Sequence, residues 1–276
     1  MLDFIKVDEI IYASLEEDMP FGDITTDYTV PEESVSEARL IAKENGVIAG
    51  LTVFERVFFL IDSNVEVNLF FEDGMSVKKG DVIAVLKGPS RAILKGERVG
   101  LNLVQRMSGI ASLTHKFVSL VEEYNVKIAD TRKTTPGLRY LEKYAVRAGG
   151  GSNHRFSLSD GVLIKDNHIV AAGGIKEAVS AVRNNIPHTV KIEVETENMD
   201  MVKEAVESKA DIIMLDNMTN DMMLEAVKYI DGRALTEASG DMNEERVVDV
   251  AKLGVNIISI GKLTHSIKCL DISLKF

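Results

Sequence analysis

The sequence contains very little cysteine, tryptophan or proline. Its 276 residues include one cysteine, no tryptophan and five prolines. A single cysteine, Cys269, forms no disulfide within the chain and gives none of the paired spacings of a zinc site. It also has no evident base partner, so we expect it to be a small buried apolar residue. A reducing compartment, the cytoplasm, fits this cysteine content best.

Long apolar runs and excess positive charge are missing as well. The apolar runs are too short to cross a membrane, and the N-terminus lacks the basic start and small-residue cleavage site of a signal peptide. The chain has 43 Asp and Glu against 32 Lys and Arg, a net charge of -11. This balance argues against nucleic acid or an acidic membrane as a partner of the whole protein.

One segment of this acidic chain is nevertheless basic. Between residues 132 and 155 the only acid is Glu142, and the cations are Arg132, Lys133, Arg139, Lys143, Arg147 and Arg155. A local cluster of this kind predicts a small, highly charged ligand. For the three cations spaced i, i+4, i+8 from Arg139 to Arg147, a solvated helix face is an equally good explanation. The other three lie outside that spacing.

After about residue 125, short apolar runs alternate with helical stretches. Runs buried on both faces and separated by crossover helices indicate a parallel sheet. An eighth strand is hard to find, so residues 108–265 are predicted to form an incomplete, open α/β barrel of six or seven parallel strands. The runs are "VKIAD", "GVLIKD", "TVKIEVE", "ADIIMLDN", "RALTEAS" and "VNIISIG", and the helices between them should begin near Gly174, Asn198, Thr219 and Asn243.

Residues 1–107 show a less regular pattern and are predicted to form a mixed α/β N-terminal domain. An Asn-Gly pair is a strong two-residue turn signal, so residues 38–51 are expected to form a hairpin. The long helix expected at the end of this domain contains Gly100 and Gly109 as weak points. The tail, residues 266–276, is expected to form a further strand that packs on this first domain.

Polar residues stand where the six predicted strands end. The C-terminal ends of barrel strands are where active sites form. Polar residues commonly terminate strands, but their occurrence on six strands in a row favours a site. They are Arg132, Lys133, Lys165, Asp166, Glu193, Glu195, Asp216, Glu237, Ser239 and Gly261.

These residue types indicate a ligand with several negative charges. Arginine binds carboxylates and phosphates through two parallel hydrogen bonds, and lysine acts as a compact charge. Glu193 and Asp216 offer oxygen ligands for a divalent cation or acceptors for sugar hydroxyls, with ion pairing to the basic residues as the alternative. Loops after the last two strands offer backbone N–H groups to phosphate. The residues expected to bind the anionic ligand are Arg132, Lys133, His154, Arg155 and Lys165, and those of the loops are Ser239, Gly240 and Gly261.

Ten segments, in this order, resemble the quinolinate phosphoribosyltransferase family, which is also called nicotinate-nucleotide pyrophosphorylase (carboxylating). The resemblance runs from about residue 16 to the C-terminus, and the pair "TRKTTPG" and "GGGSNHR" is its most specific part. The segments are "EDMPFGDITT", "KENGVIAGL", "GERVGLNLVQRMSGIAS", "DTRKTTPGLR", "AVRAGGGSNHR", "LIKDNHI", "IEVET", "MLDNM", "EASG" and "SIGKLTHS".

The resemblance implies a reaction and its partners. The family transfers the 5-phosphoribosyl group from phosphoribosyl pyrophosphate to quinolinate with decarboxylation, which yields nicotinate mononucleotide, pyrophosphate and CO2 in NAD biosynthesis. It uses Mg2+, and it works as a homodimer or a trimer of dimers whose active sites are shared between chains. Neither nucleic acid nor a membrane is expected as a partner.

The resemblance also implies roles for single residues. Lys133, Lys165, Glu193 and Asp216 are the expected catalytic residues, with the two acids facing the ribose and the Mg2+. The expected quinolinate ligands are Arg132, His154, Arg155, Lys165 and, from the partner subunit, Arg98. The expected ligands of phosphoribosyl pyrophosphate are Lys133, Glu193, Asp216, Ser239, Gly240, Gly261, Lys262 and His265.

Two residues depart from the family pattern, and three alternatives remain. Asp241 and Lys262 stand where neutral or small residues are expected, so we predict that Lys262 offsets the charge of Asp241. The first alternative is a paralogous enzyme of the same fold with another substrate. The second is a barrel aldolase that uses Lys165 as a Schiff base. The third is a lipoyl or biotin carrier, for which residues 70–88 lack a modified lysine at an exposed hairpin tip.

Overall fold

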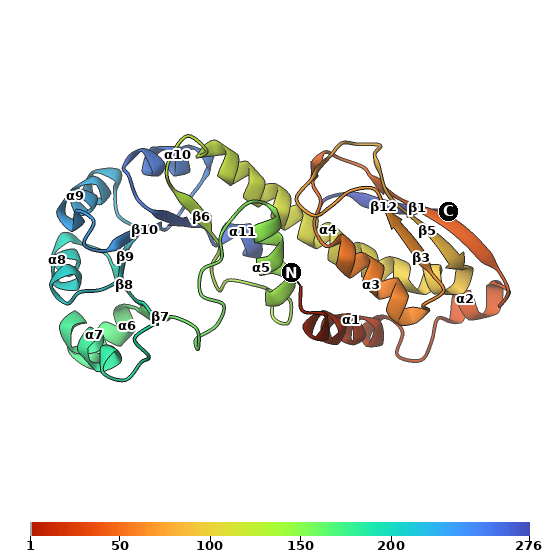
Figure 1. Cartoon of the computed structure of the whole chain (residues 1–276), viewed down its shortest axis with the longest axis horizontal. Coiled ribbons are helices and arrows are strands. Elements are labelled where there is room, and N and C mark those ends of the chain that lie inside the picture. Colours follow the sequence, from red (N-terminus) through yellow and green to blue (C-terminus); the bar gives the residue numbers. More distant parts are fainter. Residues whose placement is uncertain (1) are drawn as a thin grey trace. The chain divides into compact units, whose positions relative to one another are not determined.

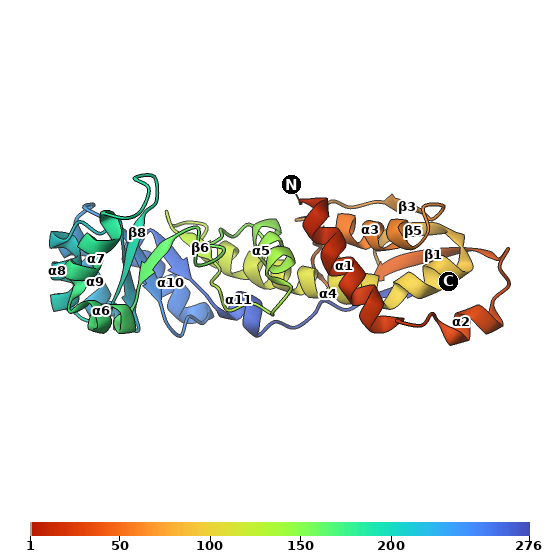
Figure 2. The same cartoon turned by 90° about the horizontal axis from the view of Figure 1, so that it is seen from below.

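The computed structural model describes residues 2–276, which form two compact units. The N-terminal unit comprises residues 2–115, 134–150 and 263–276, and the barrel unit comprises residues 116–133 and 151–262. Helix α4, Ser90–Leu120, runs through the boundary that was predicted near residue 107. Figures 1 and 2 show the helices and strands of each unit in two views.

The N-terminal unit is built on an antiparallel sheet with the strand order β12-β1-β5-β3. Helices α3 and α4 bury apolar side chains against the sheet, and the rings of Phe54 and Phe58 pack edge to face in this core. The tail strand β12 pairs with β1, with Leu40 opposite Leu274. The strands are β1 Val35–Ala42, β3 Glu66–Leu69, β5 Val82–Pro89 and β12 Ile272–Lys275; the helices are α1 Phe4–Asp18, α2 Ile24–Thr29, α3 Leu51–Ile61 and α5 Arg139–Ala148.

The hairpin predicted for residues 38–51 is wrong. Both edges of β1 are taken by β5 and β12, so β2, Gly46–Val47, pairs instead with β4, Ser76–Val77. The Asn45 side chain accepts a hydrogen bond from the backbone N–H of Lys79 at 2.9 Å. The Asn-Gly turn therefore leads the chain to another strand instead of returning it along β1.

The glycines of α4 permit close packing and do not interrupt the helix, which is continuous over 31 residues. A Cβ atom on Gly109 would overlap the backbone carbonyl of Lys268, and one on Gly100 would lie 3.1 Å from the Phe54 ring. These positions need the absence of a side chain. The expectation that they are weak points is thus wrong.

The barrel unit contains six parallel strands in the order β6-β11-β10-β9-β8-β7. The helices α7, α8 and α9 lie on the outer side of the strands (Figure 1). This arrangement confirms the predicted open α/β barrel, and all six predicted runs form strands. The strands are β6 Lys127–Ala129, β7 Val162–Ile164, β8 Ile192–Thr196, β9 Ile212–Asp216, β10 Leu235–Ser239 and β11 Ile257–Ser259.

The barrel helices begin where the sequence predicted. The side chains of Asn198, Thr219 and Asn243 each accept a hydrogen bond from a backbone N–H of the first turn, and such caps fix a helix start. The helices are α6 Asp166–Ala172, α7 Ile175–Arg183, α8 Met199–Glu207, α9 Asn220–Ile230 and α10 Glu244–Lys252; the short α11 covers Lys262–His265.

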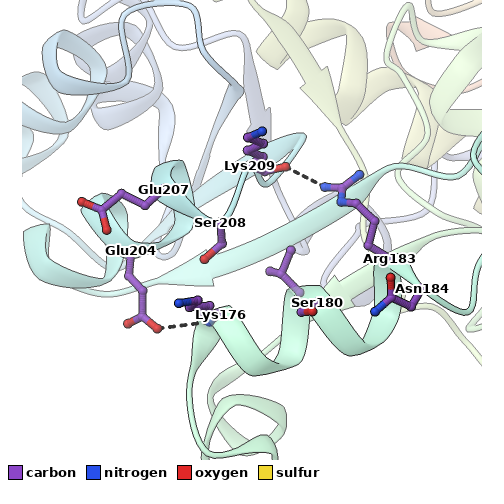
Figure 3. A pocket seen from close by; sticks show the side chains of 9 residues that line it. Lys176, Ser180, Arg183, Asn184, Glu204, Glu207, Ser208 and Lys209 are labelled. Atoms are coloured by element: carbon purple, nitrogen blue, oxygen red, sulfur yellow. Dashed lines mark hydrogen bonds between the residues drawn. The ribbon is translucent and has the colours of Figure 1, made fainter.

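Helix α7 begins after Gly174, which has no side chain to cap it. The carboxylate of Glu204 in α8 accepts from the backbone N–H groups of Ile175 and Lys176 instead, at 3.0 and 3.1 Å. A groove of about 410 Å3 lies between these two helices, and Figure 3 shows Glu204 reaching the start of α7. This contact joins neighbouring helices on the outside of the barrel.

The structure also bears on membrane-spanning helices and on the single cysteine. Among residues 2–276, none of the helices combines the length and the apolar character that a bilayer crossing requires. Cys269 is exposed, so the prediction that it is a buried apolar residue is wrong. It lies between α11 and β12, and the buried apolar residue of that segment is its neighbour Leu270.

Candidate active site

Polar residues gather at the C-terminal ends of β9 and β10. Asp216 and Ser239 are register partners at the last position of these strands. The next residue, Asn217, has a positive φ of 54° and donates its backbone N–H to the Ser239 carbonyl at 3.1 Å. Gly240 has a φ of 96° and lies against the Asn217 side chain, so no larger residue fits there. The predicted phosphate loop is thereby held close to Asp216.

The segment that carries His154 and Arg155 runs beside β6. Ser152 forms a parallel bridge with Ala129. The carboxylate of Asp130, which is fully buried, accepts from the backbone N–H of His154 at 2.9 Å and from the Asn153 amide at 2.6 Å. Backbone and side-chain bonds therefore fix this segment to the strand that precedes Arg132.

The His154 ring lies between two acids of the barrel interior. Its Nε2 atom is 3.1 Å from Oε2 of Glu193 on β8 and 3.5 Å from Oε1 of Glu237 on β10. The side chains of both acids are at most 5% exposed. Burial, and next the charge of Glu193, raises the pKa of Glu237 to about 7. Near neutral pH the Glu237 carboxyl is therefore only partly ionised.

The predicted cations Arg132 and Arg155 lie close enough for their charges to interact. Burial, and next the positive charge of Arg132, lowers the pKa of Arg155, while Glu193 acts in the opposite direction. The Arg155 guanidinium donates from Nη1 to the Gly161 carbonyl at 2.9 Å. Two half-buried guanidinium groups repel one another, and a ligand with two negative charges would relieve that repulsion.

Lys165 ends β7 and is ion-paired. Its Nζ atom lies 2.7 Å from Oε2 of Glu195 on β8. An ion pair favours the charged form of the amine, whereas a Schiff-base lysine has to lose its proton. The contact thus argues against the aldolase alternative. The same contact shows that Glu195, which was predicted to share a face of the strand with Glu193, is ion-paired with a cation of the site.

The strand register separates the two acids that were predicted to face one metal ion. Glu193 is opposite Ile212, four residues before Asp216, a distance of about 13 Å along the strand. Glu195 is opposite Met214, only two residues before Asp216, or about 7 Å. In this register Glu195 lies nearer to Asp216 than Glu193 does, and the joint binding of a metal by Glu193 and Asp216 stays a prediction.

The other predicted residues divide between the units. Arg98 is exposed on α4 and His265 on α11, and both belong to the N-terminal unit. Lys133 and Lys262 are exposed in the barrel unit, and Gly261 follows β11. Within residues 2–276, Lys262 has no carboxylate oxygen within 4.0 Å, so the predicted ion pair with Asp241 is not formed. No role of these residues is tested by their positions.

Helix α5 settles one of the two explanations offered for the basic segment. Lys143 is only 1% exposed. The solvated-face explanation therefore fails for Lys143, whereas Arg147 on the same face is exposed. Arg139, also in α5, donates from Nε to the Thr134 hydroxyl at 2.8 Å. Burial of Lys143 and the hydrogen bond of Arg139 therefore hold at least these two cations within the N-terminal unit.

Three acids of the site were not assigned by the sequence reasoning: Asp130, Glu195 and Glu237. Each ends or interrupts an apolar run, and that was the available signal. A charged residue within a buried strand is costly unless it is paired. The identity of the partners depends on strand order, which brings Glu193 of β8 and Glu237 of β10 to His154 although they follow it by 39 and 83 residues in the sequence.

Comparison with known proteins agrees with this architecture. The family model for the quinolinate phosphoribosyl transferase N-terminal domain matches residues 23–108, and that for the C-terminal domain matches residues 110–275. A probable nicotinate-nucleotide pyrophosphorylase (carboxylating) of Bacillus subtilis is 46% identical over 273 residues, which cover 99% of this chain and 94% of the relative. One of Methanocaldococcus jannaschii is 42% identical, with 96% and 95% covered.

Solved structures give the same result. The crystal structure of NadC from Streptococcus pyogenes superimposes with a TM-score of 0.96 at 42% identity and covers 100% of this chain and 98% of its own. The nicotinate-nucleotide pyrophosphorylase of Francisella tularensis gives a TM-score of 0.95 at 39% identity, with 100% and 97% covered. The two family models together span nearly the whole chain, from residue 23 to residue 275. This chain therefore belongs to the quinolinate phosphoribosyltransferase family.

Proposed function

We propose that this protein transfers the 5-phosphoribosyl group from phosphoribosyl pyrophosphate to quinolinate and releases pyrophosphate and CO2, a step of NAD biosynthesis. The observation that carries the proposal is the pair of neighbouring half-buried cations, Arg132 and Arg155, at the strand ends of a family-specific barrel. Quinolinate has two carboxylates on adjacent ring carbons, and two guanidinium groups match such a dianion in charge and in hydrogen-bond geometry.

The chemistry needs positioning and charge stabilisation more than a nucleophile from the protein. The pyridine nitrogen attacks the anomeric carbon of the ribose as pyrophosphate leaves. When the neighbouring carboxylate leaves as CO2, its bonding electron pair stays on the ring carbon, where the adjacent pyridinium charge stabilises it until that carbon takes up a proton from water. Arg132, Arg155 and Lys165 would hold quinolinate in line, and the loop of Ser239 and Gly240 would offer backbone N–H groups to the 5′-phosphate.

Mg2+ is part of the proposal. Asp216 at the end of β9 and Glu195 on the adjacent β8 are two oxygen donors on one edge of the sheet, and such donors suit a hard divalent cation. Bound there, the ion would neutralise charge on the leaving pyrophosphate. Glu193 lies deeper in the barrel, against His154, and is left out of this set.

The chain is further proposed to act as a homodimer in which Arg98 enters the partner's site. Large apolar side chains are exposed on and near α2: Phe21 is 98%, Ile24 75% and Tyr28 86% exposed. Such a group is costly in water and favours a second copy of the chain as its cover. A trimer of dimers is the other expected assembly, and sedimentation would distinguish the two. The single cysteine favours a cytoplasmic location.

The first test is turnover of quinolinate, with nicotinate as the comparison substrate. Release of CO2 and pyrophosphate that depends on quinolinate is expected. Arg132→Ala should weaken quinolinate binding by roughly 100-fold, because a bidentate charged contact is lost. Binding of phosphoribosyl pyrophosphate should change little. Calorimetric titration of each ligand measures both. Turnover of nicotinate alone, or equal effects on the two affinities, would contradict the assignment.

The shared site is tested by mixing two inactive variants. Arg98→Ala and Arg132→Ala proteins should each be inactive alone. After subunit exchange, mixed dimers contain one site with both substitutions and one intact site, so about a quarter of the wild-type activity should return. Continued inactivity after exchange that light scattering or labelled subunits confirm would show that Arg98 does not act in trans.

A further inference from the structure

Three buried groups in the barrel unit form a cluster that the proposed reaction does not yet explain. His154 comes from the segment beside β6, Glu193 from β8 and Glu237 from β10. One nitrogen and two carboxylate oxygens, one atom from each residue, lie within 4.8 Å of one another. The strand β9 separates β8 from β10. The ring of His154 therefore contacts side chains from two strands that are not adjacent in the sheet.

The two acids hold the ring from one side. The Nε2 atom faces Oε2 of Glu193 at 3.1 Å and Oε1 of Glu237 at 3.5 Å. Oε1 of Glu193 and Oε1 of Glu237 are both buried, and neither forms a hydrogen bond. Glu237 therefore contacts the ring through proximity and charge, whereas Oε2 of Glu193 lies within hydrogen-bond distance of Nε2.

The opposite side of the ring faces the backbone of Arg155. The Nδ1 atom of His154 accepts the backbone N–H of Arg155 at 2.8 Å. Since Nδ1 is an acceptor here, the ring carries its proton on Nε2, which faces Oε2 of Glu193 at hydrogen-bond distance. The two acids thus act, through the rigid His154 ring, on the backbone of Arg155. The guanidinium of Arg155 is the group that is proposed to bind quinolinate.

We propose that Glu237 is a positioning residue for quinolinate: together with Glu193 it fixes the orientation of the His154 ring and, through it, the backbone of Arg155. The proposal rests on the proposed function for its substrate. Glu237 itself is buried in the barrel, with its side chain 2% exposed. It acts on binding without reaching the ligand, and on quinolinate much more than on phosphoribosyl pyrophosphate.

Three substitutions of Glu237 test this role. Glu237→Gln retains an oxygen that faces Nε2 and should leave the quinolinate KM near the wild-type value. Glu237→Leu has similar volume but no polar oxygen beside the ring, and should raise that KM about tenfold, as expected when a buried electrostatic contact is lost. Glu237→Asp keeps the acid but withdraws it from the ring, so an increase is expected there too. The KM for phosphoribosyl pyrophosphate should stay constant throughout.

A matched control separates positioning from loss of stability. Ile213 on β9 is fully buried one residue away in the strand pairing, opposite Thr236. Ile213→Val should lower the melting temperature without changing the KM for quinolinate. If Glu237→Leu does not fold, the comparison of Glu237→Asp with Glu237→Gln decides the question. Equal quinolinate KM values in wild type, Asp and Gln variants would overturn the proposal.

Nitrogen NMR of the ligand-free, full-length protein gives a readout without turnover. The His154 ring of the wild type should show a protonated Nε2 and an unprotonated Nδ1, and Glu237→Asp should shift this signal toward a mixture of the two tautomers. A wild-type ring protonated only at Nδ1 would overturn the proposal. Wild-type protein that shows the expected ring signal but does not turn over quinolinate would instead contradict the proposed function.

Discussion

Replacing Arg106 with methionine is expected to lower the free energy of unfolding by about 3–5 kcal/mol, because a buried carboxylate would lose its partner. Glu142 in α5 is 1% exposed, and its Oε1 accepts from Arg106 Nε at 2.8 Å. Its Oε2 accepts from the Thr135 backbone at 3.1 Å. Arg106 also donates to the Thr135 hydroxyl at 2.6 Å. The pair therefore fixes the chain just after the basic strand end.

Urea unfolding of purified variants measures this loss. Replacing both partners, Arg106→Met with Glu142→Leu, should recover much of the stability, since no charge is then buried alone. Arg56→Met is the matched control, because the Arg56–Asp8 pair is more exposed and should contribute about 1 kcal/mol or less. A loss below that of the control would contradict the assigned role of Arg106.

The second large effect concerns pH and Glu237. Burial, followed by the charge of Glu193, raises the pKa of this carboxyl from 4.5 to about 7 in the folded protein. The folded state therefore holds the proton more tightly than the unfolded state does. The resulting stabilisation is complete below pH 4.5 and is lost as pH rises through 7. Its full size is on the order of 3 kcal/mol.

Glu237→Gln removes this dependence, because an amide does not titrate. The stability of the variant minus that of the wild type should therefore increase between pH 5 and pH 8 by up to about 3 kcal/mol. Urea unfolding at a series of pH values gives the difference directly. Glu66→Gln, at an exposed position of β3, controls for the loss of one acidic residue. Parallel pH profiles for wild type and Glu237→Gln would refute the assignment.

The barrel was predictable because its signals are local. Each strand is a short apolar run, and Asn198, Thr219 and Asn243 announce helices through side chains that cap the next turn. The hairpin around Asn45 failed for the opposite reason. Its turn signal was correct in kind, but the pairing of β1 was decided by β12, more than 200 residues away. The spacing of residues along the sequence does not show which strands will compete for the edges of β1.

The candidate site shows the same division. Arg132, Lys165 and Asp216 were predicted as site residues because strand ends meet at one edge of a parallel sheet. The choice between Glu193 and Glu195 was not accessible, since both share a face and only the register with β9 tells which is nearer to Asp216. Glu237 was noticed as a strand-end acid, but its contact with His154 depends on the strand order.

The pairing of β12 with β1 constrains how the protein is made. The first strand of the N-terminal sheet needs, as its edge partner, residues that are synthesised more than 200 positions later, and Ile272 and Leu274 complete the core there. During translation the edge of β1 remains open until β12 has left the ribosome. An unpaired strand edge attracts other chains, so the growing chain is most prone to aggregate in the interval before β12 emerges.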